Sequence, residues 1–370
     1  MKVLAVFGTR PEAIKMCPLV LELKQAEDVQ CVVCLTGQHK EMLKQVMDAF
    51  HIVEDYNLEI MKDRQTLTTI TTSILEKIEP ILIQERPDIV LVHGDTTTSY
   101  AAALAAFYQQ IPVGHVEAGL RTGDIYSPFP EEMNRLLTDR ISTIYFAPTE
   151  QNRQNLNKEG ITENIYVTGN TVIDAFAKTV RNDYVFHEEK LNEINFEQRK
   201  VILVTAHRRE NIGAPLQNIC NAIKNIAKKH VETLFVYPVH LNPRVRETVF
   251  NTLNNVENVL LIEPIDVLDM HNLLSRCYMV MTDSGGLQEE APHFGKPVLV
   301  LRTETERPEA VAAGTVKVVG VGENNIFCEA EKLINDFAEY RRMAKAVNPY
   351  GDGRASEKIV RALIEWKRNL

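Results

Sequence analysis

The sequence of 370 residues lacks the features that mark several specialised classes of protein. It has a single tryptophan, and its 41 lysines and arginines are outnumbered by 50 aspartates and glutamates, giving a formal net charge of −9 with histidine neutral. An acidic chain has no overall positive field to attract nucleic acid or an anionic membrane surface. We therefore expect no nucleic-acid partner and no membrane partner, and any anionic ligand must be bound by a local group of cations.

Long apolar runs are also missing from the sequence. After Met1 and Lys2, the first apolar run covers only residues 3–7, which is too short for a signal peptide or a membrane-spanning helix. Hydrophobic residues make up 45% and charged residues 25% of the chain, which are ordinary values for a soluble globular protein. The sequence thus predicts a folded cytoplasmic protein and leaves its activity open.

Cysteine is present at six positions, but its spacing gives no metal or disulfide motif. The one Cys-x-x-Cys pair, Cys31 and Cys34, lies inside an apolar run, 29–35, that is typical of a β-strand. Residues three apart on a strand face opposite sides, so one metal ion or one disulfide cannot use both thiols. No second Cys-x-x-Cys is present to complete a zinc site. We predict buried free thiols and no metal site.

Short β-branched runs alternate along the chain with amphipathic segments of helical period, a pattern typical of a parallel sheet covered by helices. The pattern occurs twice, and the polar stretch between the two halves contains no strand. At about 150 residues per domain, the length also corresponds to about two domains. The expected strands are residues 3–7, 29–36, 89–93, 112–116, 143–146 and 165–168 in the first half, and 201–205, 234–238, 259–262, 279–282, 298–301 and 316–319 in the second.

These observations predict an α/β fold of two doubly wound, Rossmann-like domains with a cleft between them. The first domain is expected at residues 1–180 and the second at 200–353, joined by a linker at 181–199. The final amphipathic segment, 354–370, follows a stretch rich in helix-breaking residues, and it is expected to form a helix that crosses back to the first domain.

Ligands of open parallel sheets bind outside the carboxyl ends of the strands, so the residues that follow each apolar run are the first candidates for a site. Ser284-Gly285-Gly286 follows the run 279–282 and would offer free backbone N–H groups to a diphosphate at the start of a helix. A simple helix cap by Ser284 with a tight glycine turn explains the same residues equally well. Arg10 and Arg307, expected at strand ends of opposite domains, favour the bound anion.

Glu290 would lie further along the same helix, where its carboxylate could accept hydrogen bonds from a ribose diol. A solvated glutamate on the helix face is the alternative. The dinucleotide fingerprint G-x-G-x-x-G is missing after the first expected strand, and no Walker A sequence is present. A nicotinamide or flavin is therefore disfavoured, and we expect no cofactor.

Three carboxylates of the first half also lie at expected strand ends or helix starts. Asp95 and Glu117 follow neighbouring strands on the same sheet edge, and Glu131 opens a helix a short loop later. Taken singly, each could be a helix cap, a loop anchor or a first-turn acid. Clustered carboxylates, however, raise one another's pKa, which proton transfer near neutral pH requires. His207, at the matching edge of the second half, could donate to a phosphate or a leaving group.

Taken together, these loops closely resemble those of the non-hydrolysing UDP-N-acetylglucosamine 2-epimerases. The resemblance runs from Met1 to the motif at 348–353, which is nearly the whole chain. The matching segments are Phe7-Gly8-Thr9-Arg10-Pro11-Glu12, His93-Gly94-Asp95-Thr96, His115-Val116-Glu117-Ala118-Gly119-Leu120-Arg121, Pro130-Glu131-Glu132, Thr168-Gly169-Asn170-Thr171, His207-Arg208-Arg209-Glu210-Asn211, Asp283-Ser284-Gly285-Gly286 and Glu306-Arg307-Pro308-Glu309-Ala310.

The resemblance implies a two-domain fold like that of the B-type nucleotide-sugar glycosyltransferases, usually as a homodimer. It also implies the reversible conversion of UDP-N-acetylglucosamine (UDP-GlcNAc) into UDP-N-acetylmannosamine (UDP-ManNAc), without a metal or redox cofactor. In the mechanism proposed for the family, the proton at sugar C2 is removed and UDP leaves from C1. The resulting 2-acetamidoglucal is reprotonated on its other face as UDP returns, and the product supplies ManNAc for cell-surface polysaccharides.

The resemblance further assigns roles to particular residues. Asp95, Glu117 and Glu131 match the acid/base group, and His207 matches the residue that assists the departure of UDP. The positions that match nucleotide-sugar contacts are Arg10, Lys15, Ser284, Gly285, Gly286, Glu290 and Arg307. Bacterial members are similar in using UDP-GlcNAc as an allosteric activator too, and the positions that match this second site are Gln38, Arg64, Arg208 and His240.

Three other functions share part of this pattern, and one of them, the hydrolysing epimerase, would release free ManNAc and UDP. A UDP-sugar-dependent glycosyltransferase of the same architecture would use a similar UDP site, but it does not need three carboxylates beside sugar C2. A catalytically silent nucleotide-sugar sensor would bind the same ligand and change nothing in it. Proton exchange at C2 distinguishes the epimerase from the glycosyltransferase and the sensor.

Overall fold

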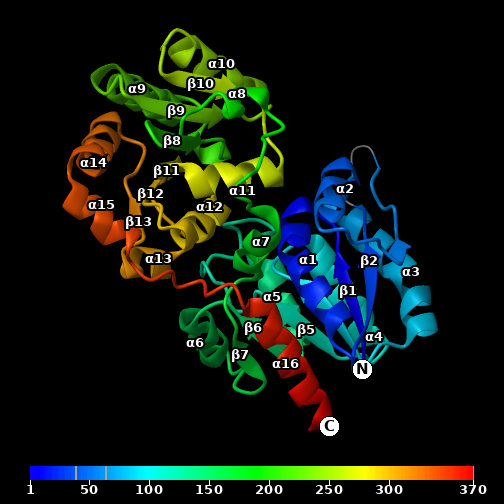
Figure 1. Ribbon diagram of the computed structural model, residues 1–370. Coiled ribbons are helices and arrows are strands. Elements are labelled where there is room, and N and C mark those ends of the chain that lie inside the picture. Colours follow the sequence, from blue (N-terminus) through cyan, green and yellow to red (C-terminus); the bar gives the residue numbers. More distant parts are fainter. Residues whose placement is uncertain (38–39, 63–64, 370) are drawn as a thin grey trace. The chain divides into compact units, whose positions relative to one another are not determined.

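The structure is a computed structural model that describes residues 1–37, 40–62 and 65–369 (Figure 1). The chain divides into two compact units. The first comprises Met1–Lys178 together with Tyr350–Leu370, and the second comprises Thr179–Pro349. The stretch for which the sequence predicts a linker, 181–199, lies within the second unit and contains the short helix α8 (Glu189–Asn192).

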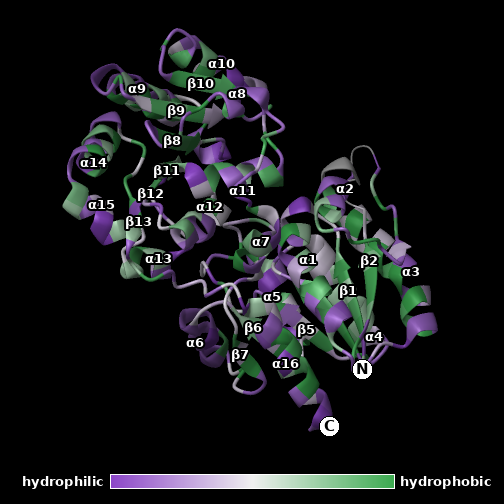
Figure 2. Ribbon diagram, in the orientation of Figure 1, coloured by the Kyte–Doolittle hydropathy of each residue, from purple (hydrophilic) through white to green (hydrophobic). Residues whose placement is uncertain are grey.

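The first unit is built on one parallel sheet of seven strands in the order β3-β2-β1-β4-β5-β6-β7. Its central strands are nearly continuous apolar runs, green in Figure 2, as expected for a parallel sheet that helices bury on both faces. The strands are β1 (Lys2–Phe7), β2 (Gln30–Leu35), β3 (Tyr56–Asn57), β4 (Ile89–His93), β5 (Val113–Val116), β6 (Ile144–Ala147) and β7 (Ile165–Val167).

Several helices of the first unit begin at a threonine that caps them. The side chains of Thr9, Thr66, Thr96 and Thr149 each accept a hydrogen bond from a backbone N–H of the first helical turn. The helices between the strands are α1 (Arg10–Gln25), α2 (Lys40–Ala49), α3 (Leu67–Glu85), α4 (Thr97–Tyr108), α5 (Glu131–Ile141), α6 (Glu150–Lys158) and α7 (Thr171–Thr179).

The last helix of the chain, α16 (Ala355–Arg368), belongs to the first unit, where it contacts α1. Asp174 on α7 caps it from a distant part of the sequence, because its carboxylate accepts hydrogen bonds from the backbone nitrogens of Ala355 (3.1 Å) and Ser356 (2.7 Å). Trp366, the single tryptophan, is buried on α16. Its fluorescence therefore reports on the first unit.

The second unit has a parallel sheet of six strands in the order β10-β9-β8-β11-β12-β13. The strands are β8 (Lys200–Thr205), β9 (Thr233–Pro238), β10 (Val259–Ile262), β11 (Met279–Thr282), β12 (Val298–Val300) and β13 (Val316–Val318). After α8, its helices are the 3₁₀ turn η1 (Arg209–Asn211), α9 (Ala214–Lys229), α10 (Pro243–Leu253), α11 (Val267–Arg276), α12 (Gly285–Glu290), η2 (Ala291–Phe294), α13 (Pro308–Ala313), α14 (Glu323–Asn335) and α15 (Phe337–Ala344).

The strand order reverses once in each sheet, between β1 and β4 in the first and between β8 and β11 in the second. This reversal confirms the predicted doubly wound α/β class, and such switch points are where ligands bind in open parallel sheets. Every strand expected from the sequence is present. The sequence did not predict β3, a two-residue edge strand held by pairing with β2.

The cysteines follow the prediction in part. All six are free, and four of them are buried, but Cys31 is half-buried and Cys328 is exposed. Cys34 lies in the apolar core of the first sheet while Cys31 does not, as alternation along β2 requires. Within the described ranges, no helix is both long and apolar enough to cross a membrane.

Candidate active site

Glu117 is the most tightly held of the three predicted carboxylates of the first unit. It follows β5 directly and has a φ of 68°, a left-handed conformation that is uncommon for residues with a Cβ. Its Oε2 accepts a hydrogen bond from Nδ2 of Asn170 (2.8 Å) and pairs with the ammonium group of Lys15. Two further elements, α1 and the loop before α7, therefore fix the direction of this carboxylate.

Asp95 follows β4 and is held from α5. Its Oδ2 accepts hydrogen bonds from Nε (2.9 Å) and Nη2 (2.6 Å) of Arg135, and its backbone carbonyl accepts one from Nδ2 of Asn134 (2.9 Å). A Cβ on Gly94, the residue before it, would stand 3.4 Å from Oε1 of Glu117. Asp95 and Glu117 thus both adjoin Gly94, at the carboxyl ends of adjacent strands.

Glu131 opens α5, the same helix that carries Arg135, and the structure gives its carboxylate no hydrogen bond among the described residues. Its neighbour Glu132 is instead the buried acid of this turn. Glu132 accepts hydrogen bonds from the backbone of Thr122 and Gly123 and from Nη1 of Arg135. Glu132 therefore fixes the loop before α5.

His93, at the end of β4, belongs to the same group, although the sequence did not single it out. Its Nε2 lies 3.7 Å from Oε2 of Glu117 and is buried without a hydrogen-bond partner among the described residues. Burial lowers the pKa of His93 to about 4, against the opposing effect of Glu117. The imidazole is accordingly neutral at neutral pH. Arg10, the predicted nucleotide-sugar contact of this unit besides Lys15, is the first residue of α1.

In the second unit, the loops after β8 and β12 bring Arg208 and Arg307 to the predicted glycine turn, which follows β11. A Cβ on Gly285 would stand 3.5 Å from Nη2 of Arg307 and 3.8 Å from Nη2 of Arg208. Arg307 is also paired through Nε with the buried carboxylate of Glu289. These distances place two guanidinium groups beside the backbone at which α12 begins.

Ser284 precedes α12 without capping it by a side-chain hydrogen bond. The alternative explanation of Ser284, that its side chain caps this helix, is therefore not supported by the structure. Glu290, the last residue of α12, directs its carboxylate back toward the glycines. A Cβ added to Gly286 would lie only 3.0 Å from Oε1 of Glu290. The turn, the serine and Glu290 consequently face one small region of the second unit.

Asp283 organises the loop after β8 that carries His207. Its fully buried Oδ2 accepts hydrogen bonds from the backbone nitrogens of His207 and Arg208, both at 2.8 Å, and from Nδ2 of Asn211 at 2.9 Å. The His207 ring stacks on that of His240, with centroids 5.0 Å apart and planes 4° from parallel. Partial burial lowers the pKa of His207, and Asp283 opposes this effect.

The positions matching an activator site are only partly visible. Gln38 and Arg64 lie outside the described residues. Arg208 and His240 both lie beside His207 in the second unit, so they adjoin the group described above. The described residues thus place Arg208 and His240 beside the predicted substrate contacts of the second unit.

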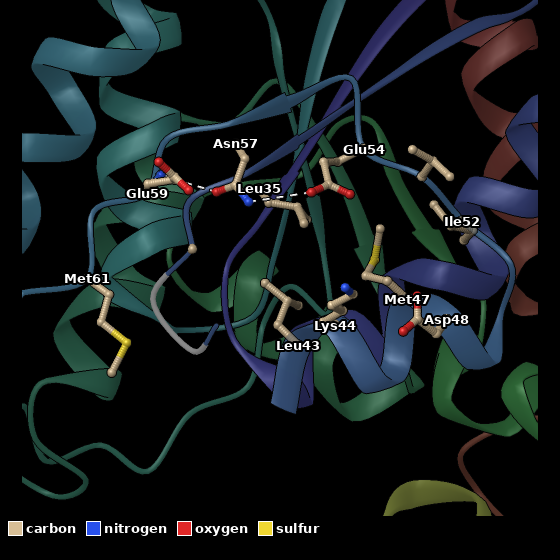
Figure 3. Close-up of a pocket in the computed structure, with 12 residues that line it drawn as sticks. Leu35, Leu43, Lys44, Met47, Asp48, Ile52, Glu54, Asn57, Glu59 and Met61 are labelled. Carbon is tan, nitrogen blue, oxygen red and sulfur yellow. Dashed lines mark hydrogen bonds between the residues drawn. The ribbon is translucent and has the colours of Figure 1, made fainter. Parts of the chain in front are cut away.

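A cavity of about 680 Å³ lies elsewhere in the first unit, between α2 and the segment around β3 (Figure 3). Leu43 and Met47 form its apolar side, and Glu54, Asn57 and Glu59 face it from the other side. The catalytic and substrate-binding residues that the sequence predicts are all absent from its lining.

One group in the described part of the chain has metal-ligand geometry, namely His187, Asp266 and Asp269. Its acids already have structural partners. Asp266 caps α11 by accepting a hydrogen bond from the backbone nitrogen of Asp269, and Asp269 accepts one from the hydroxyl of Tyr184 (2.8 Å). The cluster therefore has a structural explanation that requires no ion.

Two units, each with a doubly wound parallel sheet, define the chain as a two-domain α/β protein of the Rossmann-like type. Residues 21–364 match the family model described as UDP-N-acetylglucosamine 2-epimerase. The chain belongs to this family of isomerases.

Individual relatives cover nearly the whole length of the chain. It is 54% identical over 365 residues to the UDP-N-acetylglucosamine 2-epimerase of Bacillus subtilis, covering 98% of this chain and 95% of the relative. A crystal structure of UDP-GlcNAc 2-epimerase from Neisseria meningitidis bound to UDP-GlcNAc has 52% identity and a TM-score of 0.91, over 99% of this chain and all of the other. A complex of the Methanocaldococcus jannaschii enzyme with UDP-GlcNAc and UDP has 34% identity and a TM-score of 0.80, covering 99% of this chain and 100% of the other.

Proposed function

We propose that this protein interconverts UDP-GlcNAc and UDP-ManNAc through proton removal at sugar C2 and reversible elimination of UDP. The observation that carries the proposal is the group of carboxylates at the carboxyl ends of β4 and β5. There, Asp95 and Glu117 both adjoin Gly94 and are each held by a cation, Arg135 and Lys15 respectively. Membership of the epimerase family supports the same reaction.

In the proposed reaction, one carboxylate of the first unit takes the proton from C2. The electron pair of that C–H bond forms the C1–C2 double bond, and the C1–O bond breaks as UDP leaves. Another acid then returns a proton to the opposite face of 2-acetamidoglucal while UDP adds back to C1. Asp95, Glu117 and Glu131 are the proposed acid/base residues, and the order in which they act stays open. Hydrogen bonds from Arg135 and Asn170 fix the carboxylates before the substrate arrives, which lowers the barrier by orientation.

The residues of the second unit are proposed to bind the UDP that departs and returns. Guanidinium groups donate paired hydrogen bonds to phosphate oxygens, and Arg208 and Arg307 lie beside the backbone of Gly285. His207, held beside them by the loop bound to Asp283, is proposed to assist the leaving diphosphate. Ser284, Gly286 and Glu290 are proposed contacts of the diphosphate and the ribose, and Arg10 is a proposed contact from the first unit.

We further propose a homodimer, a cytoplasmic location and activation by a second UDP-GlcNAc molecule at Gln38, Arg64, Arg208 and His240. Exposed large apolar side chains on α3 and α4, among them Ile83, Phe107 and Tyr108, support a protein partner surface on the first unit. The proposed product would supply ManNAc to enzymes that build cell-surface polysaccharides.

The reaction is tested by incubating the protein with UDP-GlcNAc in D₂O and following the sugar by NMR. Deuterium at C2 together with the appearance of UDP-ManNAc is the expected result. A glycosyltransferase or a nucleotide-sugar sensor would leave the C2 proton in place, and that outcome would overturn the proposal.

The residue roles are tested with neutral variants of nearly the same shape. Asp95→Asn, Glu117→Gln and Glu131→Gln should each abolish deuterium incorporation while UDP binding, measured by calorimetry, is retained. Glu54→Gln is the matched control and should leave turnover unchanged, because Glu54 lines the cavity between α2 and β3, which contains none of the three proposed acid/base residues. Near-normal turnover in any of the three site variants would remove that residue from the acid/base group.

A further inference from the structure

The inward face of α5 is charged where a surface helix usually presents apolar residues. Glu132, Arg135 and Asp139 follow one another at helical spacing and are 1%, 4% and 0% exposed. Arg135 binds both Glu132 and Asp95, so the first part of this face is already explained by the proposed site. Asp139, one turn further along, has no part in the reaction proposed above.

Asp139 faces His115, a fully buried histidine on β5. The ring Nδ1 of His115 lies 2.6 Å from Oδ1 of Asp139, and the ring Nε2 lies 2.8 Å from the backbone oxygen of Gly94. A backbone carbonyl can only accept a hydrogen bond, so Nε2 carries a hydrogen. Whether Nδ1 carries one as well depends on the charge of Asp139.

Asp139 is ionised in this setting. Its second oxygen, Oδ2, accepts a hydrogen bond of 2.6 Å from Nη2 of Arg121, which is in turn paired with Glu159. Burial alone would raise the pKa of Asp139, but its pKa is lowered, and the guanidinium of Arg121 contributes to this independently of the charge of His115. An ionised carboxylate can only accept, so Nδ1 of His115 carries a hydrogen as well.

We infer that His115 is an imidazolium ion locked between Asp139 and the Gly94 carbonyl, and that it positions Asp95 for proton transfer. Gly94 has a φ of 64° and directly precedes Asp95, so the direction of its carbonyl sets the start of the Asp95 loop. The four charges of Asp139, His115, Arg121 and Glu159 cancel, which allows the ion to persist in a buried place. His115 is a positioning residue and acts through Gly94.

This arrangement ties Asp95 to α5 by two routes. Arg135 holds the carboxylate directly, and Asp139 holds the preceding peptide through His115. The inference rests on the proposed function, since it assigns a purpose to His115 only if Asp95 transfers a proton. The charge of the His115 ring does not depend on whether the protein catalyses this reaction.

Two variants separate the bonds that His115 makes. The amide nitrogen of asparagine corresponds in position to Nδ1 of histidine, so His115→Asn can keep the hydrogen bond to Asp139. The amide nitrogen of glutamine corresponds to Nε2, so His115→Gln can keep the hydrogen bond to the Gly94 carbonyl. Both variants remove the same charge. His115→Asn should lower kcat by about tenfold to a hundredfold, as expected when a catalytic group is misplaced by a fraction of an ångström to an ångström. His115→Gln should keep kcat within about threefold of the wild type, and KM should change little in both.

The protonation of the ring is measured on the wild-type protein by ¹⁵N NMR with labelled histidine. Hydrogens on both ring nitrogens of His115 are expected at pH 7, because the hydrogen bonds to Asp139 and Gly94 each require a ring donor. A ring with one hydrogen at pH 7 would overturn the inference, and so would an equal loss of kcat in the two variants or full kcat in His115→Asn. If the wild type incorporated no deuterium into UDP-GlcNAc, the proposed function would fail while the charge of the ring would still be decided.

Discussion

Replacing Glu12 by glutamine and by alanine should affect the stability of the first unit very differently. Glu12 is 1% exposed and joins the loops after β1 and β4. Its Oε2 accepts hydrogen bonds from the backbone nitrogens of Gly8 (3.0 Å) and Thr9 (2.7 Å). Its Oε1 meets the hydroxyls of Thr96 (2.7 Å) and Ser99 (3.1 Å). These loops carry Arg10 and Asp95, so Glu12 also supports the candidate site.

Alanine leaves the two buried backbone donors without an acceptor. Each unsatisfied donor costs about 1–3 kcal/mol, so Glu12→Ala should lower the free energy of unfolding of this unit by about 2–6 kcal/mol. Glutamine keeps an oxygen for the two backbone nitrogens, and its amide group can donate to the two hydroxyls, which can also accept. Glu12→Gln should therefore remain within about 1 kcal/mol of the wild type at pH 7.

The pH dependence supplies a second, independent test of Glu12. Burial raises the pKa of Glu12 above 4.5, although hydrogen bonds from Thr96, Thr9 and Gly8 oppose the shift. Between the unfolded and the folded pKa, the native state binds more protons than the unfolded state, so stability falls as pH rises through the folded pKa. Lowering the pH toward 4.5 should accordingly stabilise the wild type relative to Glu12→Gln, which has no titratable group at this position.

Urea unfolding followed by the fluorescence of Trp366 measures both effects, because this single tryptophan is buried on α16 against α1. Glu22→Gln, on the same helix as Glu12, is the control and should stay within about 0.5 kcal/mol of the wild type. The reasoning is refuted if Glu12→Gln is as unstable as Glu12→Ala. A free-energy difference between wild type and Glu12→Gln that does not change from pH 7 to pH 5 would refute the account of the buried charge.

Three further changes have definite expected outcomes. Because burial lowers the pKa of His93 to about 4, the unfolded state takes up this proton first as the pH falls below about 6.5. His93 should therefore remove about 3 kcal/mol of stability between pH 6.5 and pH 4, and acid unfolding of His93→Gln should lack that loss. Asp174→Ala uncaps α16 and should lower the unfolding free energy measured by Trp366 fluorescence by about 1–2 kcal/mol, with a smaller effect for Asp174→Asn. Asp283→Ala releases the loop after β8 and should weaken UDP binding, measured by calorimetry, by about tenfold or more, whereas an unchanged affinity would show that this loop does not bind UDP.

The strands were readable from the sequence because strands buried on both faces of a parallel sheet are continuous apolar runs. The edge strand β3 was not readable, since only two residues pair and neither is part of an apolar run. The positions of Asp95 and Glu117 at strand ends also followed from the sequence. Neighbouring strands of a parallel sheet bring their carboxyl ends to one edge, so placing the strands places the residues that follow them.

The partners of those residues were decided only by the tertiary structure. Lys15 pairs with Glu117 from 102 positions away, and Arg135 reaches Asp95 across 40 positions. Hydrophobic periodicity indicates which face of a helix is buried, but it does not indicate which buried charges meet. The charged inner face of α5 is the clearest case, because Asp139 alone resembles a surface acid and becomes the partner of His115 only when α5 packs beside β5. The sequence thus determined the sheets and the edge at which the acids gather, while the packing of helices on those sheets decided how each acid is held.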